Sequence, residues 1–145
     1  MSSSNTKIYV AQAQAWLRGV YGLDPAVVDE LGADDVIVSY PIFEKIFGHS
    51  VIKGQDAVRR FAVGFGQRWA EPEVTFHTTI AQDDQVVLVW SFKARNVGSA
   101  QADVQASNEL HEWGGITLIR FNDAGKIVAE IGEESEPGPM GRLSL

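Results

Sequence analysis

Apolar residues recur at helical spacing in three stretches of the first half of the chain. Amphipathic helices are therefore predicted over residues 8–21, 25–31 and 55–69. The second helix has a clear start, because Asp24 is a good capping residue and Pro25 fits the first helical position. The first half is thus predicted to be mainly helical.

The second half of the chain alternates between apolar and polar residues, which is the period of β-strands. Long strands are predicted over residues 73–81, 85–95, 107–121 and 126–134, and a short one over residues 35–40. Residues 42–53 show no clear period and are predicted to be a loop, and the polar residues 96–105 suit a hairpin tip. Helices followed by a meander of strands argue for an α+β fold, with the helices gathered on one face of an antiparallel sheet.

No internal repeat or low-complexity linker divides the 145 residues, so we expect one domain over residues 1–145. Residues 1–6 are predicted to be a disordered tail. Residues 137–145 begin with Pro-Gly-Pro, which cannot extend a sheet, so they are predicted to form a turn-rich tail. That tail either folds back over the pocket, crosses to a partner subunit or stays loose.

Composition excludes several classes of function. A net charge of −7 repels phosphate backbones, so no nucleic-acid partner is expected. The chain has no cysteine, which rules out disulfides, zinc–thiolate sites and a thiol nucleophile. We expect no membrane partner and a cytoplasmic location, because no apolar run approaches the roughly 18 residues of a membrane span and no secretion signal is recognisable.

Three local patterns resemble the nuclear transport factor 2-like superfamily: residues 33–41, residues 54–61 with a glycine before a helix, and the hairpin of residues 119–128. This superfamily includes ketosteroid isomerases, SnoaL-type polyketide cyclases and limonene epoxide hydrolase. The resemblance implies a cone-shaped α+β barrel, in which a curved antiparallel sheet wraps around three N-terminal helices and an apolar pocket. It also implies a homodimer that pairs through the sheet face, but it does not imply one reaction.

The resemblance is strongest to the broad SnoaL-like group. Ketosteroid isomerases have an aspartate base just before the proline that ends the first strand, and the matching residue here is Tyr40. Their oxyanion site matches Trp16 and Thr117, so a steroid isomerase of the usual mechanism is not expected. In the SnoaL-like group an acid and a histidine on late strands assist proton transfer, and no cofactor is implied.

Strand parity predicts a group of polar residues on the inward face of the last hairpin. If Thr117 lines the pocket, His111 and Trp113 point the same way, while pairing across the turn brings Glu130 opposite Thr117 and Glu134 opposite Trp113. Two carboxylates and a histidine in an apolar cavity suit general acid–base catalysis. A slip of one residue would turn all of them to solvent, where the glutamates would form an acidic edge and the histidine a surface ion pair.

Aromatic residues are numerous on the elements that would surround the pocket. They are Trp16, Tyr40, Phe43, Phe65, Trp69, Trp90, Phe92 and Trp113. Core filling accounts for most of them, but three large rings on the concave face also predict an aromatic-lined site for a small, flat, hydrophobic molecule. The remaining histidines, His49 in a loop and His77 on an outward strand position, do not have the spacing of a metal site, so no metal is expected.

Two hypotheses of function follow. The first is a SnoaL-like, cofactor-independent enzyme that isomerises, cyclises or dehydrates a small hydrophobic molecule, with Glu130 or His111 as base and Tyr40 polarising an oxygen. Its substrate would be held by Trp16, Phe43, Phe65, Trp90, Phe92, Trp113, Thr117 and Glu134. The second is a non-catalytic binding or dimerisation module that uses Val87 and Val89 on the outer sheet face. A hydrolase is a weaker third possibility, because few polar groups are available to position a water molecule.

Overall fold

The computed structural model describes residues 3–99 and 105–143. Its helices are α1 (Ser3–Tyr21), α2 (Val27–Leu31), α3 (Ile42–Phe47), α4 (Gln55–Arg68) and a short 3-10 helix, η1 (Gly141–Leu143). Its strands are β1 (Gly32–Ser39), β2 (Val51–Lys53), β3 (Trp69–Gln82), β4 (Gln85–Asn96), β5 (Leu110–Phe121) and β6 (Ile127–Ser135). Among the described residues, no helix is both long and apolar enough to cross a bilayer.

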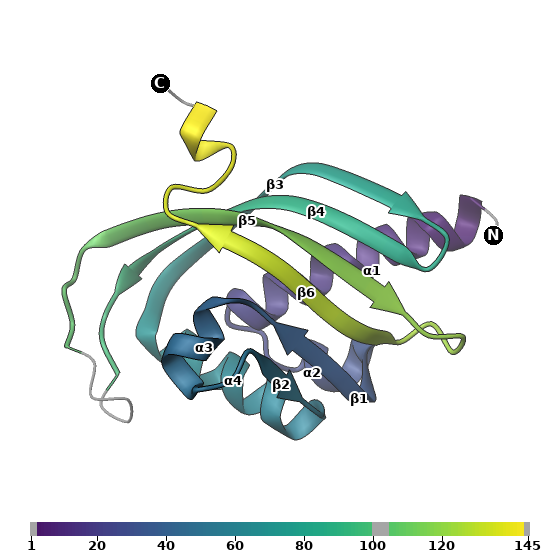
Figure 1. The fold of residues 1–145 in the computed structure, drawn as a ribbon, viewed down its shortest axis with the longest axis horizontal. Coiled ribbons are helices and arrows are strands. Elements are labelled where there is room, and N and C mark those ends of the chain that lie inside the picture. The colour runs from purple at the N-terminus through teal and green to yellow at the C-terminus, as the bar shows by residue number, and fades with distance from the viewer. Residues whose placement is uncertain (1–2, 100–104, 144–145) are drawn as a thin grey trace.

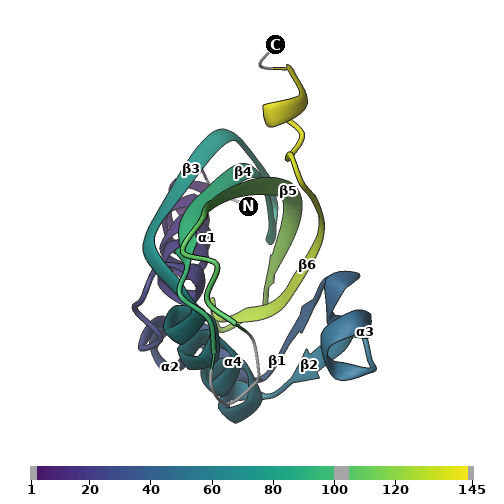
Figure 2. The same cartoon turned by 90° about the vertical axis from the view of Figure 1, so that its left-hand side faces the viewer.

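The strands form one sheet in the order β2-β1-β6-β5-β4-β3. Strands β3 to β6 are an antiparallel meander, and β1 joins them by parallel pairing with β6. The sheet bends around an interior that α1, α2 and α4 close from the side left open by the strands (Figures 1 and 2). This confirms the predicted curved α+β fold.

The concave face of the sheet supplies much of the core. Alternate residues of β4 point inward and are at most 5% exposed: Val86, Leu88, Trp90, Phe92 and Ala94. Helix α1 packs against this face with Ala13, Trp16, Leu17 and Val20, which are almost completely buried. The predicted helical stripe of α1 is therefore the stripe that the core buries.

Two predictions about the first half of the chain are wrong. Helix α1 begins at Ser3, so residues 3–6 are helical rather than a disordered tail, since these residues contain no glycine or proline to interrupt a helix that the buried stripe stabilises. Residues 42–53 contain α3 and β2 instead of a loop. The apolar pattern does not reveal helix α3, because Phe43 is its one buried residue. The helix is also short, since Gly48, with φ of 78°, ends it after less than two turns.

Other element boundaries shift by a few residues. Helix α2 begins at Val27, two residues later than predicted, and β3 begins at Trp69 rather than after Pro72. A proline is tolerated in β3 because this is an edge strand and its pairing with β4 is irregular between Ala70 and Glu73. Strand β5 begins at Leu110 rather than at residue 107, because Asn108, with φ of 57°, does not have the backbone conformation of a strand. Residues 100–104 of the predicted hairpin tip lie outside the described residues.

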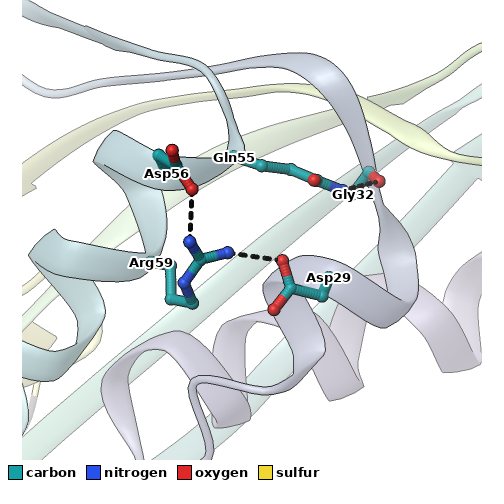
Figure 3. Close-up of polar contacts among 5 residues, drawn as sticks. All are labelled: Asp29, Gly32, Gln55, Asp56 and Arg59. Carbon is teal, nitrogen blue, oxygen red and sulfur yellow. Dashed lines mark hydrogen bonds and ion pairs between the residues drawn. The ribbon is translucent and has the colours of Figure 1, made fainter.

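Polar contacts fix the start of α4 against α2 and β1 (Figure 3). The Arg59 guanidinium donates to Asp29 of α2 at 2.7 Å and also to Asp56 of its own helix. The Gln55 amide donates to the carbonyl oxygen of Gly32 at 3.0 Å. These contacts orient α4 so that its inner face, which includes Phe65, lies over the interior.

The C-terminal segment leaves β6 on the side of the sheet away from the helices (Figure 1). Gly138 is buried against Gly114 of β5, and a Cβ atom built on Gly138 would lie 2.3 Å from the Gly114 Cα. Arg142 donates to the Ser135 hydroxyl at 3.0 Å. The described part of the predicted tail therefore folds back onto the outer face of the sheet rather than over the interior; residues 144–145 are not described.

Candidate active site

Glu130 of β6 is a carboxylate that is completely buried in the interior. Its Oε1 accepts a hydrogen bond of 2.7 Å from Trp16 Nε1 of α1. Its Oε2 accepts two bonds of 2.6 Å, from the hydroxyls of Tyr21 at the end of α1 and Tyr40 just after β1. One side chain thus receives three donors from two separate parts of the fold.

The hydrogen-bond chain continues beyond Tyr40 to β5 and β4. The Tyr40 hydroxyl lies 2.7 Å from Thr117 Oγ1, which also accepts a bond of 2.9 Å from Trp90 Nε1. Since the Tyr40 hydrogen points to Glu130, the Thr117 hydrogen points to Tyr40. Every donor in the chain is therefore directed toward the Glu130 carboxylate, an arrangement that suits its ionised form.

The titration of this network reflects two opposing effects. Burial raises the pKa of Glu130, while the hydrogen bonds from Tyr21, Tyr40 and Trp16 favour its charged form and lower the pKa. Burial, followed by the negative charge of Glu130, raises the pKa of both tyrosines well above their ordinary value. The two phenols are thus held as hydrogen-bond donors.

The register of the last hairpin differs from the predicted one but keeps the same face inward. Glu130 pairs with Ile119, and Thr117 pairs with Gly132 rather than with Glu130. The pairing of Phe121 with Ile127 next to the turn differs by one residue from the predicted register, and an irregularity between Arg120 and Phe121 adds the second; an even total shift leaves side-chain direction unchanged. Glu130 and Thr117 therefore both point inward, as the strand parity predicted.

Two glycines on the inward face of the last hairpin, Gly132 and Gly115, make room for the network. A Cβ atom on Gly132 would lie 2.3 Å from the Tyr40 ring and 2.7 Å from Thr117 Oγ1. A Cβ atom on Gly115 would lie 2.8 Å from the Trp90 indole. A side chain at either position would push the ring away from its hydrogen-bond partner.

Glu134 is a second carboxylate on the inward face of β6, and it is only partly buried. Burial, and next the nearby charge of Glu130, raise the pKa of Glu134 to about 7. In residues 3–99 and 105–143, no side chain forms a hydrogen bond or an ion pair with it. Its partner across the hairpin is Gly115, not the predicted Trp113.

Most of the predicted substrate-binding rings pack against one another beside this network. The Phe43 ring lies 5.6 Å from that of Tyr40, measured between ring centres, and the Phe65 ring lies 5.1 Å from that of Tyr21. The Phe92 and Trp113 rings, 4.6 Å apart, extend the cluster along the sheet. All eight residues predicted to hold a substrate are thus near Glu130 or in this aromatic cluster, including Trp16, Trp90 and Thr117.

Two open depressions lie at the end of the sheet near the aromatic cluster. One, of about 310 Å³, lies between the sheet and the C-terminal segment, where Trp113 and Gly138 contribute to its wall. Another, of about 410 Å³, is lined by Phe92 and by residues such as Glu73 and Lys93. Neither includes Glu130 or Tyr40, so the apolar pocket stays a prediction.

A family model described as a SnoaL-like domain matches residues 13–130. That span runs from the buried stripe of α1 to Glu130 and includes Tyr21, Tyr40 and Thr117. The chain belongs to the SnoaL-like family. This confirms the resemblance inferred from the sequence, and Glu134 lies just beyond the matched span.

Solved structures share the fold of this SnoaL-like protein at low sequence identity. AclR from Streptomyces galilaeus is 16% identical with a TM-score of 0.71, over 95% of this chain and 96% of that one. An LEH-like epoxide hydrolase from M. tuberculosis is 16% identical with a TM-score of 0.67, over 90% of this chain and 85% of that one. An NTF2-like protein of unknown function from Burkholderia pseudomallei is 19% identical with a TM-score of 0.66, over 91% of this chain and 90% of that one. At these identities the likeness establishes the fold and not the reaction. No curated protein matches the chain.

The structure separates His111 of the SnoaL-like chain from the two inward carboxylates. His111 Nδ1 lies 3.6 Å from Glu136 Oε1, and its ring contacts Trp69 at 5.5 Å between ring centres. Of the other histidines, His49 contacts the carbonyl oxygen of Val51 and His77 contacts the Ser91 hydroxyl, both at 2.7 Å. In the part of the chain that the structure describes, no three His, Asp or Glu side chains are grouped as a metal site requires.

Tyr21 is the residue of the candidate site that the sequence analysis missed. It is the last residue of α1 and lies four residues after Leu17, on the buried face, but helical spacing alone shows neither its hydrogen bond nor its partner. The end of α1 comes within hydrogen-bonding distance of Glu130 only in the folded structure, where the sheet curves around the helix.

Proposed function

We propose that this protein is a cofactor-independent SnoaL-like enzyme that performs acid–base chemistry on a small hydrophobic molecule, with Glu134 exchanging the proton. The observation that carries the proposal is a partly buried carboxylate with a pKa of about 7, beside the hydrogen-bonded carboxylate of Glu130. Acid and base forms of such a group are both well populated at neutral pH, which is what general acid–base catalysis requires.

Glu130 takes a positioning role in this proposal rather than the role of base. Its two oxygens already accept three hydrogen bonds, and none of its surface reaches solvent. For Glu130 to accept a proton from a substrate, at least one tyrosine would have to give up its hydrogen bond to this carboxylate. Its negative charge instead keeps the pKa of Glu134 high and holds the phenols of Tyr21 and Tyr40 in place.

The proposed reaction is an isomerisation, cyclisation or dehydration, because each requires a proton to leave one atom of the substrate and return to another. One carboxyl group that ionises near neutrality can do both steps. The substrate would lie against the rings of Phe65 and Trp113, whose side chains are partly buried and in contact with each other at 6.4 Å between ring centres. A ligand that enters from either depression described above would have to move these rings aside to reach Glu130, which lines neither of them.

The proposal is tested by carbon NMR of protein labelled at the glutamate carboxyl groups, titrated alone and with a panel of flat hydrophobic compounds. We expect one carboxyl signal to titrate near pH 7, to disappear in Glu134→Gln and to shift when a compound binds. Glu133→Gln is the matched control, because Glu133 is the next residue but is exposed on the outer face. If Glu134 titrates near the ordinary value of about 4.3 and no compound shifts it, the acid–base proposal is wrong.

A second candidate function is a binding or dimerisation module that uses the outer face of the sheet. Strand pairing aligns Ile80, Val87, Leu118 and Ile131 in one apolar row across β3, β4, β5 and β6. Ile80 is 60% exposed and Ile131 is 43% exposed, which is unusual for a row of large apolar residues on a monomer. Sedimentation equilibrium of the native chain and of Val87→Lys would test it, with loss of a homodimer in the variant as the expected result.

A further inference from the structure

The interior carboxylates lack a basic partner in the described part of the chain. The ion pairs among the described residues, such as Arg59 with Asp29, Lys93 with Glu73 and His111 with Glu136, do not include Glu130 or Glu134. The pKa of Glu134 is shifted by burial and by Glu130, with no contribution from a lysine, arginine or histidine. The negative charge of either carboxylate, when it is ionised, is therefore not balanced by a described cationic side chain.

Glu134 is the carboxylate of the two that has hydrogen-bonding capacity left. Glu130 is saturated by Trp16, Tyr21 and Tyr40, whereas no described side chain bonds to Glu134. Glu134 faces Gly115 across the hairpin, so no side chain of β5 lies between it and the interior at that level. Its oxygens are available to an incoming group.

Aromatic residues lie near this carboxylate, since its charge contributes, after burial, to the raised pKa of Tyr21 and of Tyr40. Trp113 is two residues from Gly115 on β5, and the Phe65 ring bridges the rings of Trp113 and Tyr21 at 6.4 and 5.1 Å between centres. The faces of aromatic rings are electronegative and attract cations. A carboxylate beside several such rings is the combination that recognises a positively charged nitrogen with apolar substituents.

We infer that the molecule received by this site is an organic ammonium, whose charged nitrogen pairs with Glu134 and whose apolar part packs on Phe65 and Trp113. The inference rests on the proposed function, since it names the substrate class of the same site. A cation also relieves the repulsion between Glu130 and Glu134, which a neutral ligand leaves in place and an anion increases.

Two probes of nearly identical shape separate the effect of charge from that of size. Benzyltrimethylammonium is a permanent cation, and neopentylbenzene replaces its nitrogen with carbon and is neutral. Binding of each is followed through the side-chain NMR signals of Phe65 and Trp113 and through tryptophan fluorescence. We expect the cation to bind about tenfold more tightly, or better, and Glu134→Gln to remove that difference while Glu133→Gln keeps it.

A substitution of a ring provides an independent test that leaves both carboxylates in place. Phe65→Leu retains an apolar residue but removes one aromatic face, and we expect it to weaken binding of benzyltrimethylammonium more than binding of neopentylbenzene. Equal binding of the two probes with shifts of Phe65 and Trp113 would overturn this inference while leaving the proposed pocket intact. Failure of both probes to bind would overturn the inference and the proposed pocket together.

Discussion

The Tyr21 hydroxyl donates a hydrogen bond of 2.6 Å to Oε2 of Glu130, and so connects the last residue of α1 to the middle of β6. Tyr40 donates to the same oxygen from the end of β1. Because Trp16 holds the other oxygen, the carboxylate fixes the end of the long helix relative to two neighbouring strands. The same contacts that position Glu130 therefore also stabilise the closure of the sheet on the helices.

Replacement of Glu130 by glutamine should destabilise the fold. The amide group offers one acceptor where the carboxylate has two, so a buried donor loses its partner and the remaining bonds lose their charge. We expect the free energy of unfolding to fall by about 2–3 kcal/mol, measured by urea denaturation. Glu133→Gln, on the exposed face, should change it by less than about 0.5 kcal/mol. Equal stability of the Glu130 variant and the native chain would contradict the network as described.

The two tyrosines should differ in what their hydroxyls contribute. Tyr21→Phe removes one bond to Glu130, while Tyr40→Phe also leaves the Thr117 hydroxyl without its partner. We expect losses of about 1.5 kcal/mol for Tyr21→Phe and nearer to about 3 kcal/mol for Tyr40→Phe in the free energy of unfolding. The double variant should show a coupling energy of more than about 0.5 kcal/mol, because both hydroxyls share one oxygen. Strict additivity, or the reverse order, would show that the shared oxygen is not the common partner.

Periodicity predicts the elements that bury one clear face and fails for those that do not. Strand β4 alternates without a break and is predicted to within one residue, and the buried stripe of α1 is predicted although the start of that helix is not. Helix α3 buries only Phe43, and β2 has three residues, so neither contains enough positions to show a period. The predicted pairing of the last hairpin was wrong by two residues, because neither the pairing next to the turn nor the irregularity between Arg120 and Phe121 can be read from alternation.

Parity nevertheless locates Glu130 inside the fold, since an even error in register keeps its side chain on the same face. Sequence cannot show that this carboxylate is saturated while Glu134 is free, because the difference depends on Tyr21, which reaches the site only through the tertiary fold. The position of His111 beside Glu136 and Trp69 is likewise set by packing at the end of the sheet. The proposal that Glu134 rather than Glu130 exchanges protons therefore depends on the tertiary structure and could not be made from the sequence.

Gly132 should not tolerate a methyl group, because its neighbour Tyr40 has no room to yield. The added Cβ of Gly132→Ala would lie 2.3 Å from the Tyr40 ring, so the ring must move away from Glu130 and Thr117. We expect a loss of about 1–3 kcal/mol in the free energy of unfolding. Gly64→Ala is the matched control, since no atom lies within 4 Å of the added Cβ and alanine favours the helix, so that variant should be more stable by up to about 1 kcal/mol. A harmless alanine at position 132 would mean that Tyr40 is not held where the structure has it.

The raised pKa of Glu134 should make the fold less stable as the pH rises through neutrality. With a pKa of about 7 when folded and about 4.3 when unfolded, the folded protein binds the extra proton between these values. The stabilisation is fully present below about pH 4.3 and is lost as the pH approaches and passes 7. After allowance for partial exposure, it amounts to about 2–3 kcal/mol. The free energy of unfolding is measured by urea denaturation at several pH values between 5 and 8. Over this range we expect the value for the native chain to fall, relative to that for Glu134→Gln, by most of this amount. The Glu133→Gln variant should follow the native chain throughout, and a constant difference between native and Glu134→Gln across this range would place the Glu134 pKa at its ordinary value.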